Sequence, residues 1–140
     1  MTVIKDFVDF YQQLDKNSAK QLSSLYHPDI TLIDPVSTYS GLPALEQYFA
    51  ALLSNTGSCG FNIDAINHLG DRAFVSWQMN FTHPKLSAGD PIKVEGISHI
   101  LIKNNKIVYQ RDYYDLGSML YEHLPIIGYL VRYLKRKIAK

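Results

Sequence analysis

Two aspartates stand at places in the sequence where a carboxylate could do acid–base chemistry. Asp34 ends the strand-like run 30–34 and precedes Pro35, and Asp112 lies inside the strand-like run 106–115. When two carboxyl groups share a pocket, burial and mutual repulsion separate their pKa values, so that one can act as a base and the other as an acid. Each also has a purely structural interpretation: Asp34 can form a local Asx turn, and Asp112 can pair with an arginine or cap a helix. The residues alone leave both interpretations open.

The other reactive residue types do not form a recognisable centre. The single cysteine, Cys59, has no adjacent base that would activate its thiol. The histidines lie in different predicted elements, away from cysteines or carboxylates at metal-ligand spacing: His27, His68, His83, His99 and His123. No glycine-rich phosphate loop is present. We therefore expect no bound metal and no cofactor.

The elements that must position the two carboxyl groups follow from hydrophobic spacing. Apolar residues at helical spacing predict an amphipathic helix over residues 3–15, a shorter helix that ends before Pro28, and a third helix that starts at Gly41-Leu42-Pro43 and ends near Asn55. Four strand-like runs follow, at 61–69, 72–83, 91–103 and 106–115. Gly70-Asp71 and Asn104-Asn105 are suited to tight turns between them. Helices grouped before long antiparallel strands indicate an α+β domain.

Length and composition favour one globular domain spanning residues 1–140. The chain is 46% hydrophobic and 19% charged, and no apolar run approaches the roughly 18 residues that a membrane span requires. The start of the chain lacks the pattern of a signal peptide, and one cysteine cannot form an internal disulfide, so we expect a cytoplasmic protein. Residues 1–131 contain nine basic and thirteen acidic residues, which argues against a nucleic-acid partner.

The C-terminal extension, residues 116–140, differs from the rest of the chain. It combines a long apolar stretch with five basic and no acidic residues over 132–140. Three explanations compete: a helix that closes the pocket or packs on a partner subunit, a helix on an anionic membrane surface, and a solvated terminus. Arg132, Lys135 and Arg136 surround the apolar stripe and are the expected lid or membrane contacts.

The order of elements and two motifs resemble the nuclear transport factor 2-like cone, and within it the SnoaL-like family. Residues 30–36 read Ile-Thr-Leu-Ile-Asp-Pro-Val, similar to the ketosteroid isomerase segment in which the Asp before Pro-Val is the general base. Residues 111–115 read Arg-Asp-Tyr-Tyr-Asp, similar to the end of the last strand in limonene epoxide hydrolase. The resemblance implies a cone-shaped, strongly curved antiparallel sheet with the N-terminal helices on its concave face, a C-terminal helical extension, an apolar pocket, and a homodimer formed through the open face of the sheet.

The isomerase resemblance assigns Asp34 as the general base but leaves the oxyanion hole incomplete. Phe10, which has no hydrogen-bond donor, takes the place of the oxyanion tyrosine, and Tyr11 is expected to point about 100° away around the helix. Ser98 stands where that family has a protonated aspartic acid. True steroid isomerase activity is therefore not expected.

The epoxide hydrolase resemblance retains only Asp112. Gln78 and Asn80 replace the Arg and Asp of its Arg-x-Asp pair, and Leu32 and Asp34 replace the Tyr and Asn that hold the attacking water. Amides cannot do the work of that ion pair, so epoxide hydrolysis is not expected.

These matches, extended by strand alternation, predict a pocket for a small hydrophobic ligand. The polar residues expected on its side of the sheet are Ser76, Gln78, Asn80, Ser98, Gln110, Asp112 and Tyr114. One hypothesis is a cofactor-free isomerase or cyclase with Asp34 as base and Asp112 as its partner. The alternative is a non-catalytic carrier or accessory protein that binds a lipid-like ligand, at the membrane surface through the C-terminal helix. Whether the protein is an enzyme stays open.

Overall fold

A computed structural model of the chain describes residues 2–55 and 58–139. Its first half contains the helices α1 (Thr2–Gln12), η1 (Ser18–Gln21), α2 (Leu22–Leu25) and α3 (Leu42–Asn55), with the strands β1 (Tyr26–Ile33) and β2 (Thr38–Ser40) between them. Its second half contains β3 (Ser58–Leu69), β4 (Arg72–Thr82), η2 (Ser87–Gly89), β5 (Ile92–Lys103), β6 (Lys106–Tyr114), α4 (Leu116–Met119), η3 (Tyr121–His123) and α5 (Pro125–Ile138). The predicted α+β class is confirmed.

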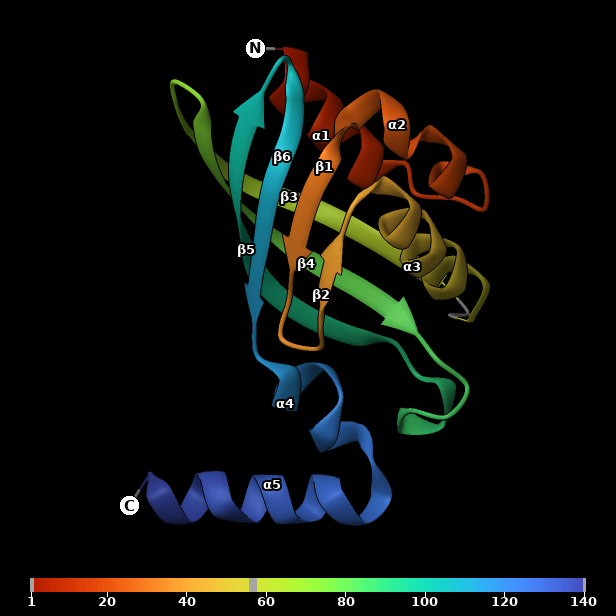
Figure 1. Ribbon diagram of the computed structural model, residues 1–140. Coiled ribbons are helices and arrows are strands. Elements are labelled where there is room, and N and C mark those ends of the chain that lie inside the picture. Colours follow the sequence, from red (N-terminus) through yellow and green to blue (C-terminus); the bar gives the residue numbers. More distant parts are fainter. Residues whose placement is uncertain (1, 56–57, 140) are drawn as a thin grey trace.

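The strands form one strongly curved sheet in the order β2-β1-β6-β5-β4-β3 (Figure 1). The pairs from β3 to β6 are antiparallel hairpins, as predicted, and β1 pairs antiparallel with β2. The exception to an antiparallel sheet is the pair of β1 with β6, which is parallel. Because β1 and β6 run parallel, their C-terminal ends lie at the same end of the cone. Asp34 and Asp112 are therefore neighbours there.

The turns between the long strands follow from residues that tolerate positive φ. Gly70 has φ 59° between β3 and β4, and Asn104 and Asn105 have φ 53° and 60° between β5 and β6. Two consecutive residues with positive φ give the type I′ geometry that matches the twist of a hairpin. The tight turn predicted at Asn104-Asn105 is confirmed.

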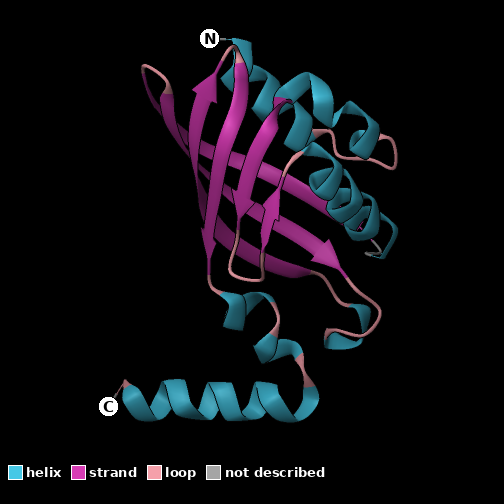
Figure 2. Ribbon diagram, in the orientation of Figure 1, coloured by secondary structure: helices cyan, strands magenta, loops and turns pink. Residues whose placement is uncertain are grey.

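Helices α1, α2 and α3 cover one face of the sheet, and none of the described helices packs on the opposite face (Figure 2). Helix α1 buries Ile4, Phe7 and Tyr11 at the i, i+3, i+7 spacing of one helical face. These side chains join the larger of two apolar clusters, on the covered face of the sheet, in which Tyr26 and Ile100 are fully buried. The smaller cluster consists of Phe81, Leu86, Ile92 and Val94, and Met119, Leu120 and Leu124 of the C-terminal extension pack against it.

Strand register decides which polar residues face the helices. Ser98 on β5 lies opposite Val75 on β4 and Asp112 on β6, so these three residues share the covered face. Because side chains alternate along a strand, the even-numbered residues of β4 point to the uncovered face.

Ser76, Gln78 and Asn80 therefore lie on the uncovered face of the sheet. The prediction that they lie on the pocket side was wrong, because aligning Gln78-Met79-Asn80 with the Arg-x-Asp motif placed β4 one residue out of register. A one-residue shift moves every side chain of a strand to the other face.

The C-terminal extension is helical, as predicted. Gly128 is a residue type that usually weakens a helix, but it lies inside α5 and is buried against the backbone of Glu122, where a Cβ would have no room. Helix α5 lies beyond the open end of the cone, attached through α4 and η3 (Figure 1). Among the described helices, none has the length and apolar character to cross a bilayer.

Candidate functional site

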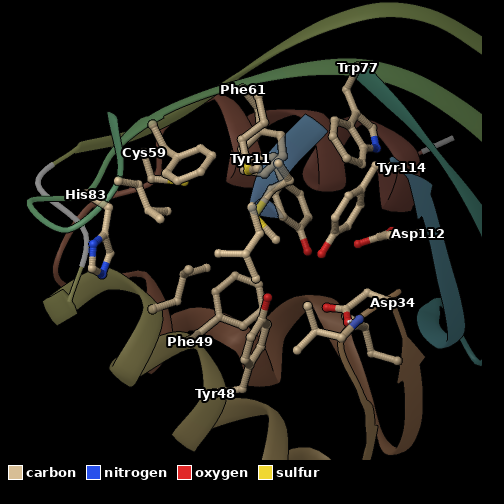
Figure 3. A pocket seen from close by; sticks show the side chains of 18 of the residues that line it. Tyr11, Asp34, Tyr48, Phe49, Cys59, Phe61, Trp77, His83, Asp112 and Tyr114 are labelled. Carbon is tan, nitrogen blue, oxygen red and sulfur yellow. Dashed lines mark hydrogen bonds between the residues drawn. The ribbon is translucent and has the colours of Figure 1, made fainter. Parts of the chain in front are cut away.

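A cavity of about 470 Å³ opens between the covered face of the sheet, α3 and the segment 119–124. Its wall is mainly aromatic and aliphatic, with Phe49 from α3, Trp77 and Phe81 from β4, and Met119 and Leu124 from the C-terminal extension. Small-molecule sites commonly have volumes of roughly 300–1,000 Å³ and apolar walls with a few polar groups. Figure 3 shows Asp34, Asp112 and the hydroxyl of Tyr114 at one end of the cavity, and His83 at the opposite end.

Asp112, at this polar end, is held by one of its two oxygens. Its Oδ1 accepts hydrogen bonds from the Ser98 hydroxyl at 2.6 Å and the Gln110 amide Nε2 at 2.9 Å. Its Oδ2 makes no hydrogen bond with the described residues, and since those residues include no buried polar atom without a partner, Oδ2 is open to the cavity. The carboxyl group is therefore fixed in orientation with one free oxygen.

A second layer of contacts fixes Ser98. The Trp77 indole donates to the Ser98 hydroxyl at 2.8 Å, so the serine's own proton is directed to Asp112. Gly96 makes this contact sterically feasible, because a Cβ there would lie 2.3 Å from the Trp77 ring. The small residue on β5 lets the indole reach its partner.

Two buried tyrosines fix Gln110. Tyr26 donates to Gln110 Oε1 at 2.5 Å, and the hydroxyls of Tyr11 and Tyr26 are 2.7 Å apart. Because the single proton of Tyr26 goes to Gln110, the Tyr11 hydroxyl is the donor to Tyr26. Burial raises the pKa of both tyrosines, which keeps them protonated. Tyr11 therefore lines the cavity with its only proton already engaged.

The environment of Asp112 raises its pKa to about 6. Burial is the main cause, and the hydrogen bonds from Ser98 and Gln110 act in the opposite direction by stabilising the carboxylate. The nearby charge of Asp34 raises the pKa further. A carboxyl group with this pKa exchanges protons close to neutral pH, as a general base or acid requires.

Asp34 lies next to Asp112 but is held in a different way. Its Oδ1 accepts from the backbone N–H of Val36 at 2.8 Å and of Ser37 at 2.9 Å, which is the predicted Asx turn. Ile33 pairs with Arg111 across β1 and β6, so the two aspartates follow at the same level of adjacent strands. Asp34 is part of the cavity wall as well as of the turn.

Tyr48 and Tyr114 add two hydroxyl groups to the cavity. Neither hydroxyl has a hydrogen-bond partner within the part of the chain that the structure describes, and Figure 3 shows both pointing inward. The ring of Tyr48 stacks on Tyr39 with a centroid distance of 4.2 Å. Burial and, next, the charge of Asp34 raise the pKa of both hydroxyls, so both are protonated donors at neutral pH.

The predicted site residues therefore fall into three groups. Leu32, Asp34, Asp112 and Tyr114 line the cavity. Ser98 and Gln110 lie behind Asp112 and hold it in place. Ser76, Gln78 and Asn80 lie on the other face of the sheet, and Phe10 packs edge-on against Tyr11 and Phe49 instead of lining the cavity.

Sequence reasoning missed Tyr26 and Tyr48 and misplaced Tyr11. The expectation that Tyr11 points away from the pocket was wrong, because the buried stripe of α1 runs through Phe7 and Tyr11. The i, i+4 spacing of those two aromatic residues was the signal that could have placed it. Tyr26 was assigned to a helix but begins β1, and no motif indicated Tyr48.

Two further features bear on the chemistry available. Burial raises the pKa of Cys59, which lines the cavity, to about 11, so its thiol stays protonated. Among the described residues, no group of three or more His, Cys, Asp or Glu is arranged to hold a metal ion. The acid–base groups that line the cavity are thus carboxyl and phenol groups together with two basic side chains, His83 and Lys85.

A curved sheet with helices on one face and a cavity at its open end defines the α+β cone shared by nuclear transport factor 2-like and ketosteroid isomerase-like proteins. The sequence model of the SnoaL-like domain matches residues 7–110, and the chain belongs to that family. No curated protein sequence matches the chain.

Solved structures show the same fold at low sequence identity. A protein with a ketosteroid isomerase-like fold from Catenulispora acidiphila, crystallised in complex with trimethylamine, is 18% identical with a TM-score of 0.74, over 88% of this chain and 93% of that one. TerC, co-crystallised with polyporic acid, is 16% identical with a TM-score of 0.72, over 85% and 95%. A protein classed as a SnoaL-like polyketide cyclase from Jannaschia sp. is 12% identical with a TM-score of 0.68, over 85% and 87%.

Proposed function

We propose that the cavity binds a small, mainly apolar carbonyl compound and moves a proton on it, as a cofactor-free isomerase or cyclase. One observation carries this proposal: Asp112 is fixed through Oδ1, exposes Oδ2 to an apolar cavity, and has a pKa raised to about 6. Structural relatives crystallised with trimethylamine or polyporic acid, and one classed as a polyketide cyclase, support a small-molecule role.

The proposed reaction begins with Asp112 as general base. Its free Oδ2 takes a proton from the carbon next to the carbonyl group, and the electron pair of that C–H bond forms an enolate with its charge on oxygen. The hydroxyls of Tyr48 and Tyr114 donate hydrogen bonds to that oxygen. In a β,γ-unsaturated substrate the enolate is a dienolate, and Asp112 returns the proton to its γ-carbon, which is an isomerisation. In a substrate with a second carbonyl group, the enolate carbon instead attacks that carbonyl carbon, the C=O π electrons move to its oxygen, and Asp112 gives that oxygen the proton, which is a cyclisation.

This proposal exchanges the roles expected for the two aspartates. Asp34 was the expected base, but its Oδ1 stabilises a turn at the rim of the cavity. Asp112 has both the raised pKa and the hydrogen-bond support of a poised base. Asp34 acts through its charge, which favours the protonated form of Asp112.

Deuterium exchange tests the proton transfer without knowledge of the natural substrate. The wild-type protein is incubated in D₂O with β-tetralone, an apolar ketone with exchangeable protons, and deuterium incorporation next to the carbonyl is followed by NMR. We expect catalysed exchange that is lost in Asp112→Asn and retained in Asp64→Asn, a matched change of an exposed aspartate on β3. Equal exchange in wild type and Asp112→Asn would exclude Asp112 as the base.

A non-catalytic carrier is the second candidate, and the engaged proton of Tyr11 favours it. A carrier needs polar groups that orient its ligand but no oxyanion hole. The Tyr11 hydroxyl on α1 donates its proton to Tyr26, so it cannot also donate to an oxyanion. Native mass spectrometry of the gently purified protein distinguishes the two. A tightly held ligand together with no exchange on any ketone tested would favour the carrier.

We also infer a homodimer formed through the uncovered face of the sheet. Phe74, Ile97 and Tyr113 are large apolar residues exposed on that face. The Arg111 guanidinium lies over the Tyr113 ring, and His99 stacks on Phe74. Light scattering should give twice the chain mass of 16.0 kDa, and the value should fall towards 16.0 kDa in Ile97→Lys. A monomer mass for the wild type would contradict the inference.

A further inference from the structure

We propose that α5 is a docking surface for an anionic lipid bilayer, with its apolar face in the lipid interface and the cone above it. The inference is independent of the reaction proposed for the cavity. It starts from an unusual orientation: α5 is amphipathic, but its polar side packs on the protein and its apolar side faces away.

The side of α5 that faces the cone is mostly polar and small, with one half-buried apolar residue, Val131, near Gly117. Lys135 pairs with Glu122 at 3.2 Å and with Asp115 at 3.7 Å, and Arg132 donates to the backbone carbonyl of Glu122. Gly128 is buried against the same Glu122 backbone. Arg132 and Lys135, which the sequence suggested as lid or membrane contacts, therefore fix the helix to the protein.

The side that faces away carries a continuous apolar stripe. Ile127, Leu130, Leu134 and Ile138 recur at helical spacing, and their exposed fractions are 48%, 50%, 53% and 81%. Ile126 beside them is 76% exposed. Burying an apolar side chain is favourable by roughly 1.5–3 kcal/mol, so a stripe of this size is expected to have an occupant.

The lid explanation does not account for this stripe. Among the described residues that line the cavity, the C-terminal extension contributes Met119, Leu120 and Leu124, which precede α5, and no residue of α5 itself. The wall of the cavity is thus formed by the connecting segment, while the stripe of α5 stays free.

Charge identifies the occupant as an anionic lipid surface. Helix α5 contains four basic residues and no acidic residue, and Arg136 and Lys137 form no ion pair with the described residues. Two copies of α5 placed face to face would bring like charges together, whereas each basic residue near an anionic membrane gains about 1 kcal/mol. Tyr129 and Tyr133, with an apolar ring and a polar tip, suit the lipid interface.

The geometry also places the cavity near the bilayer. Helix α5 lies at the same end of the molecule as the segment 119–124 that forms part of the cavity wall (Figure 1). Lipid bound along α5 would therefore lie at the open end of the cone.

Sedimentation with vesicles tests the proposal. The full chain is mixed with vesicles of phosphatidylcholine alone and with vesicles of phosphatidylcholine and phosphatidylglycerol in equal parts. We expect binding to the anionic vesicles that weakens as salt is raised, and little binding to the neutral ones. No binding to either kind of vesicle would overturn the proposal.

Two pairs of matched variants separate the apolar and the charged contributions. The double variant Leu130→Gln/Leu134→Gln should weaken binding by about tenfold for each leucine replaced. Its control, the double variant Ile66→Gln/Leu69→Gln on exposed residues of β3, should bind as the wild type does. Arg136→Gln with Lys137→Gln should weaken binding roughly 30-fold, and Lys93→Gln with Lys103→Gln on the sheet should leave it unchanged. Equal losses in variant and control would assign binding to overall charge or hydrophobicity and overturn the docking role of α5.

Light scattering without lipid tests the competing occupant. If a second copy covers the stripe, the mass of the assembly falls in Leu130→Gln with Leu134→Gln, and the proposal is wrong. We expect this variant to have the same mass as the wild type and an unchanged circular dichroism melting curve, because both leucines are exposed in the structure.

Discussion

The two aspartates near one end of the cavity lie close together, Asp34 just after β1 and Asp112 on the adjacent parallel strand β6, yet their surroundings differ. Asp34 receives two backbone N–H groups at the rim, within the turn between β1 and β2. Asp112 receives two side-chain donors that are themselves fixed by Trp77 and Tyr26, in an environment where burial raises its pKa. The donors of Asp34 stabilise the backbone, and those of Asp112 orient a carboxyl group. The comparison indicates that the hydrogen-bond donors around a carboxylate distinguish a structural aspartate from a reactive one.

The largest expected difference between the two aspartates is in catalysis. Asp112→Asn should reduce catalysed deuterium exchange by about 10²–10⁴-fold, the usual contribution of a general base. Asp34→Asn should reduce it by about tenfold or less, since it removes a neighbouring charge and leaves the base in place. The initial exchange rates of both purified variants on β-tetralone give the comparison. The reverse order of effects would make Asp34 the base.

A smaller catalytic effect is expected from the two phenols. Tyr114→Phe and Tyr48→Phe should each reduce exchange by about 10–100-fold, because each removes a donor to the enolate oxygen. Neither hydroxyl bonds to the described residues, so thermal stability should change little. Exchange rates measured beside melting curves separate the two effects. Wild-type rates in both variants would require another oxyanion donor.

Asp112→Asn should raise the free energy of unfolding although it lowers the exchange activity. Its pKa is about 6 in the folded protein and about 3.9 in an unfolded chain, so the folded state binds the proton more tightly. The resulting stability is present below about pH 4 and is lost as the pH rises through 6. Asp112→Asn keeps the acceptor oxygen and avoids a buried charge, so it should stabilise the protein by about 1–2 kcal/mol at pH 8.

Urea unfolding at pH 8 and at pH 4 measures this effect, with Asp34→Asn as the comparison. The stabilisation by Asp112→Asn should be present at pH 8 and shrink at pH 4. Asp34→Asn should be near neutral at both, because asparagine also forms the Asx turn. A loss of stability in Asp112→Asn at pH 8 would mean that the folded site favours the ionised carboxylate.

The smallest expected effects are shifts in the pH dependence of exchange. Asp34→Asn should lower the pKa of Asp112, because the charge of Asp34 raises it, and should move the rise in activity to lower pH. Ser98→Ala should raise the pKa, because it removes a hydrogen bond to the carboxylate, and should move the rise to higher pH. Exchange rates measured from pH 4 to pH 8 test both directions, and shifts of the same sign in the two variants would contradict this account.

Much of the fold could be predicted from the sequence because short local segments specify its turns and helix ends. The hairpin at Asn104-Asn105 and the start of α3 at Gly41-Leu42-Pro43 follow from the backbone preferences of a few residues. The parallel pair of β1 and β6 joins segments far apart in the chain, and no local pattern specifies it.

The site was harder to predict because it depends on register and long-range partners. Asp112 and Asp34 were identified, but Gln78 was assigned to the wrong face by a shift of one residue in β4. Tyr26 enters the network only because Gln110, distant in sequence, lies beside it in the fold. Strand alternation gives the set of residues on a face only after the register is known.

The pKa of Asp112 in the ligand-free protein is the most direct test of the proposed site. Carboxyl carbons of aspartate can be followed by ¹³C NMR through a pH titration, with Asp112→Asn to assign the signal. We expect one aspartate to titrate with a pKa of about 6, to be missing in Asp112→Asn, and to shift to a lower pKa in Asp34→Asn. An Asp112 signal that titrates near the ordinary value of about 3.9 would contradict the assignment of Asp112 as the poised base of this cavity.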